Sequence, residues 1–226
     1  MNTIFSQLFI TDLLGSKLVR FGAIGMTDTD IKLILNNTSD RLGETITFYA
    51  ASKAVSDYCQ HHANPLLLKY VNTNKLWRTT YAAYQTAIFI NIPALVDNRT
   101  DCSTFQFAAN LLRQQKPEHS AGELLVDMES IRERYAKFRH KVFAHTDHGR
   151  ADLADEFDSA GFTWDSIDAD IKTLHFIQQV LWAIHLDQPI PTRTDALTKL
   201  TVAHLEALQI STDVEQMFQA IENGIL

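Results

Sequence analysis

The residues best suited to chemistry lie together in one short stretch, "FRHKVFAHTDHGR", which spans positions 138–150. It holds three histidines, two arginines, a lysine and an aspartate. Histidine exchanges protons near neutral pH, and arginine is a permanent cation that suits phosphate and carboxylate partners. The stretch can therefore be interpreted as a metal site, as a catalytic pair of arginine and histidine, or as the polar end of a helix, where His and Lys favour the helix dipole.

A metal site would use His145, Asp147 and His148, because imidazole and carboxylate groups suit zinc or manganese. The segment "AHTDH" resembles the end of the His-x-His-x-Asp-His signature of metallo-β-lactamase-like hydrolases. Phe143 stands where the first histidine of that signature should be, and the sequence predicts none of the sheet that carries it. No further ligand cluster accompanies these residues, so we predict no metal.

The local charge favours a site that binds an anion. The whole chain carries a net charge of -7, yet five basic residues and one acidic residue, Glu133, occupy positions 131–141. The basic residues of this ridge are Arg132, Arg134, Lys137, Arg139 and Lys141. A guanidinium can hold a phosphate and stabilise its developing charge, while a nearby imidazole moves the proton. These are the groups that metal-free cleavage of a phosphodiester requires.

The segment "RHKVFAH" resembles the motif of the HEPN (higher eukaryotes and prokaryotes nucleotide-binding) superfamily. That motif is an arginine, usually followed by Asn, Asp or His, with a histidine four to six residues beyond. Here Arg139 is followed by His140, and five residues separate Arg139 from His145. The longer "RHKVFAHTD" is especially similar to the abortive-infection branch of the superfamily. Arg134 and His140 have the same spacing and form the alternative pair.

The resemblance covers roughly residues 40–187 and implies dimers whose paired motifs form one RNA-cleaving cleft. It implies that Arg139 stabilises the transition state and that His145 acts as general acid or base. His140 would orient Arg139 or the phosphate, and Asp147 would fix the tautomer of His145 or cap the loop. The RNA contacts would come from the rest of the ridge: Arg132, Arg134, Lys137 and Lys141.

Helix geometry bears on how such a site is assembled. At about 100° per residue, Arg139 and His145 are roughly 120° apart on a regular helix. Either the last turn unwinds at Ala144, or two copies of the chain build the site across a two-fold axis. An apolar stripe on the same helix could serve the core of the chain or such an interface. It consists of Leu124, Leu125, Met128, Ile131, Tyr135, Phe138 and Val142.

The composition suits a cytoplasmic protein. Cys59 and Cys102 are too few for a disulfide framework. The first twenty residues have no basic residue before their apolar ones, and Asp12 interrupts the run, so we expect no signal peptide. The most apolar stretch, 82–96, is too short to cross a bilayer, and we expect no membrane association.

Low contents of glycine (8) and proline (5), together with helical spacing of apolar residues, predict an all-α fold. We expect one HEPN-like bundle over 1–190, with its core at about 40–187, and a C-terminal helical appendage over 191–226. The predicted helices are 3–20, a short one from Asp28 or Thr29 to Leu35, 41–62 opened by Ser39 or Asp40, a buried 74–92, one opened by the capping box at 103–106 and ending near Arg113, 122–144, 163–186, 195–208 and 212–223.

These observations lead to two hypotheses. The first is a metal-independent endoribonuclease without a cofactor, similar to HEPN toxins or abortive-infection effectors, acting as a homodimer and with an antitoxin protein as a further partner. The second is a non-catalytic helical module of the same superfamily that binds a nucleotide or a protein.

Overall fold

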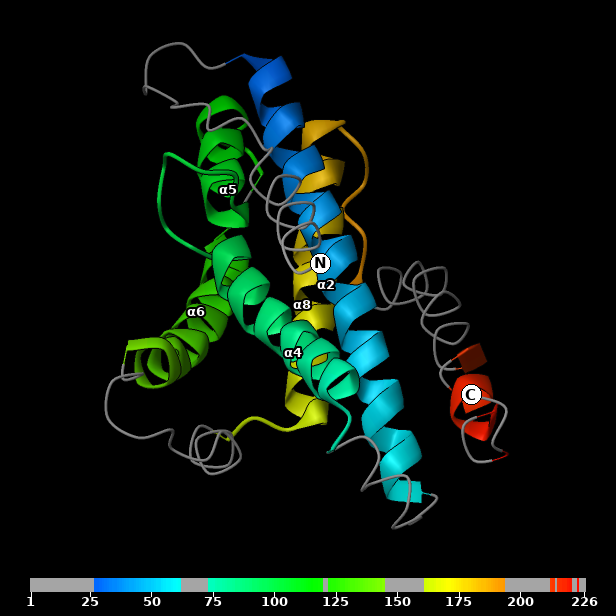
Figure 1. Cartoon of the computed structure of the whole chain (residues 1–226). Helices are drawn as coiled ribbons and strands as arrows, with labels where there is room; N and C mark the ends of the chain where they lie inside the picture. Colours follow the sequence, from blue (N-terminus) through cyan, green and yellow to red (C-terminus); the bar gives the residue numbers. More distant parts are fainter. Residues whose placement is uncertain are drawn as a thin grey trace, which may run out of the picture.

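The computed structural model describes residues 27–61, 73–119, 122–144, 161–193, 212–213, 215–220 and 223. Most of these residues are helical, the others lie in turns, bends or loops, and none is in a strand, which confirms the predicted all-α fold. The helices are α2 (Asp28–His61), α4 (Lys75–Leu95), α5 (Phe105–Gln115), α6 (Gly122–Ala144) and α8 (Trp164–His185), as Figure 1 shows. The predicted helices 3–20 and 195–208 lie outside the described residues. In the segments with an assigned structure, no helix is both long and apolar enough for a bilayer.

Helix α2 is continuous, and the predicted break near residue 39 is wrong. Thr38 Oγ1 donates to the Ile34 carbonyl at 3.0 Å, and Ser39 Oγ donates to the Leu35 carbonyl at 2.7 Å. A hydroxyl that bonds to the carbonyl one turn earlier leaves the helix intact, whereas an N-cap would accept from an amide. Ser39 Oγ also accepts the Trp182 indole N–H from α8 at 3.1 Å. This tertiary contact is compatible with Ser39 inside a continuous helix and not at an N-cap.

Short polar residues start two other helices. The N-cap of α5 is Thr104, one residue later than the predicted capping box places it, and its side chain accepts from the Phe107 amide at 3.0 Å. Helix α8 begins with a capping box between Thr163 and Ser166. Such bonds satisfy amides that have no partner inside the helix.

The core forms where α2, α4, α5, α6 and α8 pack together, and α2 and α8 lie side by side (Figure 1). Its fully buried large side chains include Ile31, Ile34, Leu35, Leu42, Ile88, Ile92, Leu95, Phe105, Leu112 and Tyr135. The prediction that α4 is buried holds only for its C-terminal half. Leu76, near the start of α4, is 74% exposed, and Tyr81 and Tyr84 are half-buried.

Candidate active site

Helix α6 carries the arginine–histidine motif at its C-terminal end. Its main chain is helical as far as Ala144, so Arg139 lies within the helix, five residues before this point. The described helix covers the predicted range, 122–144. His145, Asp147 and His148 lie outside the described residues, as do the side chains of Lys137, Arg139, His140 and Lys141. The metal alternative falls on this same segment, and the described remainder of the chain holds no cluster of three or more potential ligands.

Helix α6 runs antiparallel to α8, because two ion pairs connect them in reverse order. Arg134, in the second half of α6, pairs with Asp170 near the start of α8. Asp127, in the first half of α6, pairs with Arg193, which follows α8. The motif end of α6 and the N-terminal end of α8 therefore lie at the same end of the bundle, the lower end in Figure 1.

The Arg134–Asp170 pair is the inner of these two contacts. Arg134 Nη1 donates to both carboxylate oxygens of Asp170, at 3.0 and 2.9 Å. The Asp170 side chain is 6% exposed and that of Arg134 is 35% exposed. Burial raises the pKa of Asp170 above its ordinary value, and the guanidinium of Arg134 offsets only part of that rise. The ionised form of Asp170 is thus destabilised by burial and stabilised by the charge of Arg134 from α6.

An aromatic cluster packs beside this ion pair. The ring centroid of Tyr135 lies 5.7 Å from that of Phe89 on α4 and 4.7 Å from that of Phe162, just before α8. The Tyr135 hydroxyl is buried and makes no hydrogen bond of normal geometry with a described residue. Burial, and then the charge of Asp170, raise the pKa of Tyr135 well above its usual value. We therefore treat the contact between Tyr135 and Asp170 as electrostatic.

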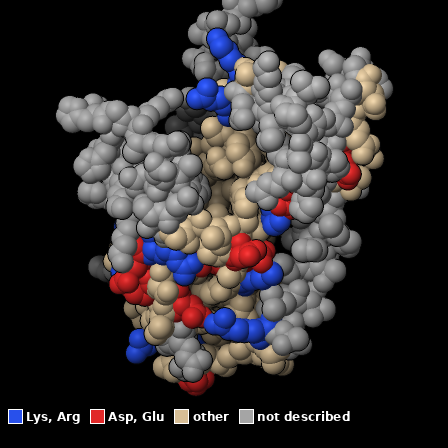
Figure 2. Space-filling model, turned by 90° about the horizontal axis from the view of Figure 1, so that it is seen from below, with Lys and Arg blue, Asp and Glu red and all other residues tan. Residues whose placement is uncertain are grey.

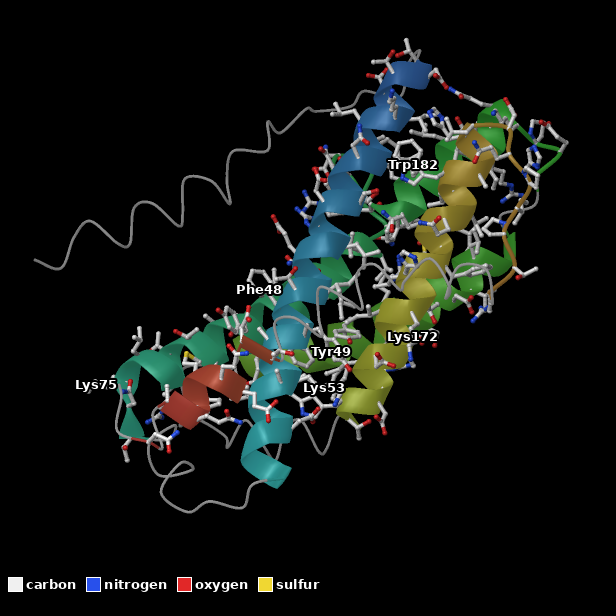
Figure 3. All side chains as sticks on the ribbon, turned by 90° about the vertical axis from the view of Figure 1, so that its right-hand side faces the viewer. Phe48, Tyr49, Lys53, Lys75, Lys172 and Trp182 are labelled. Carbon is white, nitrogen blue, oxygen red and sulfur yellow. The ribbon has the colours of Figure 1, made fainter. Side chains whose placement is uncertain are left out.

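Helices α2 and α8 also make polar contacts near the N-terminal end of α8, at the opposite end of this helix from Trp182. Figure 3 shows Tyr49 and Lys53 of α2 near Lys172 of α8. The Tyr49 hydroxyl donates to the Trp164 carbonyl at 3.3 Å, and the Trp164 indole donates to Ser56 Oγ at 3.1 Å. These bonds fix the first turn of α8 on α2, at the end of the bundle where α6 finishes.

Two members of the predicted RNA-binding ridge have carboxylate partners in the chain. Arg134 pairs with Asp170, and Arg132 pairs with Glu129 one turn earlier on α6. Figure 2 shows acidic and basic side chains interspersed over the lower part of this face. Arg132 and Arg134 therefore have less free positive charge than the sequence indicates, and the contact of the ridge with RNA stays a prediction.

The apolar stripe of α6 serves the core of its own chain wherever its side chains are described. Leu124, Met128, Ile131 and Tyr135 are all buried there. These four side chains therefore serve the core, whereas Phe138 and Val142 of the same stripe lie outside the described side chains. The dimer itself stays a prediction, supported by the motif geometry alone.

Two histidines and two tryptophans of α8 contribute to the packing of the bundle. His175 and His185 are buried, and Nδ1 of His185 lies 3.4 Å from Asp28 Oδ1. Trp164 and Trp182 are partly buried and pack against the core.

No family model, curated protein or solved structure matches this chain. The HEPN resemblance therefore depends on the motif and on the helical setting in which it lies.

Sequence reasoning missed Asp170, although a signal was present. Asp170 falls at helical spacing among Ile167, Ile171 and Leu174, on the face of α8 that enters the core. A carboxylate on such a face requires a cation from a neighbouring element as its partner. That cation is Arg134, which the sequence pattern assigned to RNA binding instead.

Proposed function

We propose that this protein is a metal-independent endoribonuclease similar to HEPN toxins and abortive-infection effectors. The observation that carries the proposal is that α6 is helical through Arg139 as far as Ala144, the residue before His145. This is the setting that the resemblance implies: a motif on the last turns of a long helix in an all-α chain. The expected partners are RNA, a second copy of the chain and an antitoxin protein, and the expected location is the cytoplasm.

The reaction is a transesterification within RNA. The 2′-oxygen attacks the adjacent phosphorus, its proton leaves to a base, and the bond from phosphorus to the 5′-oxygen breaks as that oxygen takes up a proton. The products are a 2′,3′-cyclic phosphate and a 5′-hydroxyl. His145 performs one of the two proton transfers, and Arg139 stabilises the charge on the phosphorane-like transition state. No metal ion enters these steps.

The geometry of α6 supports a cleft built from two copies of the chain. The helix is continuous from Gly122 to Ala144, so regular geometry extended by one residue would set Arg139 and His145 roughly 120° apart. One straight helix does not bring both side chains onto a single phosphate. A two-fold axis through the motif ends lets the arginine of one copy act beside the histidine of the other.

The second candidate is a non-catalytic helical module that binds a nucleotide or a protein partner. The observation that favours it is the pairing of Arg132 and Arg134 with carboxylates of the chain itself, which reduces the positive charge available for RNA.

RNA cleavage by the purified protein in EDTA tests the first proposal. We expect cleavage with cyclic-phosphate and 5′-hydroxyl ends, and loss of cleavage in His145→Ala. His148→Ala is the matched control, because the arginine–histidine mechanism does not use it whereas the metal alternative does. Loss of activity in EDTA that Mn²⁺ or Zn²⁺ restores, together with an inactive His148→Ala, would assign the site to a metal instead. Absence of cleavage by a folded wild-type protein would favour the binding module.

A further inference from the structure

Asp170 is a buried carboxylate that the proposed reaction does not use. Its side chain is 6% exposed, and both of its oxygens accept from one nitrogen of Arg134. Burying an ion pair adds little net stability, since an apolar pair of similar volume often does as well or better. Buried polar groups do fix the register of some helix pairs, as a single buried asparagine does in coiled coils. We therefore expect the Arg134–Asp170 pair to contribute more to the orientation of α6 than to the stability of the fold.

The orientation concerned is that of α6 about its own axis. The neighbouring contacts of Tyr135 with Phe89 and Phe162 are between rings, which tolerate small rotations. The hydrogen bonds from Arg134 to Asp170 tolerate them less, because such bonds weaken steeply away from linearity. Among the described side chains on this half of α6, Arg134 makes a directional contact with α8 through these two hydrogen bonds.

Small rotations at this point matter for the motif. Arg139 lies five residues beyond Arg134, about 7.5 Å further along the helix axis. A side-chain group at a radius of about 6 Å moves by about 1 Å when the helix turns by about 10°. Misplacement of a reacting group by about 1 Å can reduce a rate by about 10²-fold.

We propose that Asp170 is a positioning residue for the motif: through Arg134 it fixes the rotation of the C-terminal turns of α6 and so the direction from which Arg139 reaches the phosphate. The effect on cleavage rests on the proposed function, whereas the effect on α6 does not. Because Asp170 is buried, it acts through Arg134 and not on RNA.

Asp170→Asn tests this role. The amide has nearly the same shape but cannot accept on both atoms, and it removes the buried charge. Arg134, which is 35% exposed, can be hydrated in the variant, so we expect a melting temperature close to that of the wild type. We expect kcat for RNA cleavage to fall by about 10- to 100-fold with little change in KM, and the amides of residues 136–144 to exchange hydrogen faster.

Asp127→Asn is the matched control. It removes a carboxylate from the other ion pair of α6, the more exposed one with Arg193 at the opposite end of the helix. We expect wild-type kcat and wild-type exchange at residues 136–144. If Asp170→Asn does not fold, Arg134→Lys repeats the test, because it keeps the positive charge but loses the reach of the guanidinium, and the same fall in kcat is expected.

The outcomes separate the two proposals. Unchanged exchange at residues 136–144 in folded Asp170→Asn would overturn the positioning role, and so would faster exchange with an unchanged kcat. A fall in activity that follows the melting temperature across all variants would assign Asp170 to stability alone. If the wild-type protein cleaves no RNA but hydrogen exchange at residues 136–144 is faster in Asp170→Asn, as expected, then Asp170 does fix the rotation of α6 and the proposed function fails.

Discussion

Removal of Arg134 should destabilise the protein in a way that depends on pH. In Arg134→Met the apolar stem can still pack, but Asp170 loses the cation that its two oxygens accept from. Breaking a buried pair by removing one partner costs about 3–5 kcal/mol. Because the Arg134 side chain is about one-third exposed, water can reach the gap, and we expect about 2–4 kcal/mol near neutral pH. For a chain of this size that corresponds to a fall in Tm of roughly 5–15 °C.

The direction of the pH dependence follows from Asp170. Burial raises its pKa in the folded protein, so the folded state binds this proton more tightly than the unfolded state does. The contribution of Asp170 to stability therefore falls as pH rises from its unfolded pKa, about 3.9, through its folded pKa. Without Arg134 the folded pKa rises further, because the charge that lowers it is gone. The cost of Arg134→Met should thus grow with pH and shrink toward about pH 4.

Urea unfolding followed by circular dichroism measures this cost, at about pH 4.5, about pH 6 and about pH 7.5. Arg134→Met combined with Asp170→Asn should lose the pH dependence. Arg193→Met, which breaks a more exposed pair with Asp127, should cost less than about 1 kcal/mol at each pH. A cost for Arg134→Met that is the same at all three values would refute the reasoning, because it would mean that the Asp170 charge does not contribute to it.

The remaining predictions concern the motif and assembly. His145→Ala should lower the rate of RNA cleavage by about 10²- to 10⁴-fold with a Tm near that of the wild type, and a folded, fully active His145→Ala protein would refute the site. Arg139→Ala should also lose activity, and Arg139→Lys should remain nearly as inactive, because an ammonium group lacks the bidentate fork of a guanidinium. Elemental analysis should find no stoichiometric zinc, and one tightly bound transition metal per chain would contradict this. Light scattering at micromolar concentration should give a dimer, and a monomer that still cleaves RNA would exclude a two-copy cleft. Lys141→Ala should reduce the salt dependence of RNA binding by a slope of about 0.7, and Arg132→Ala, whose charge is already paired, should reduce it less.

The elements that local signals define were predicted well from sequence. The bounds of α6 match the prediction, and α8 matches it to within a residue, because helical periodicity and the Thr163 cap are readable in a single segment. The split of α2 was wrong because a serine can cap a helix or bond within one. The choice depended on Trp182, a residue more than a hundred positions away, which donates to Ser39 Oγ.

The same limit applied to the candidate site. The basic ridge was counted along one helix, where five cations face one carboxylate, whereas an RNA phosphate responds to charges in space. Asp170, on another helix, forms an ion pair with Arg134. Glu129, which lies just before the counted residues 131–141, forms one with Arg132. Arg132 and Arg134 are therefore already paired within the chain, and RNA contact by Lys137, Arg139 and Lys141 stays a prediction. Under the proposed function, the positive charge that binds RNA would come from the end of α6 that carries the motif, and such a local charge is compatible with a net charge of -7 for the whole chain.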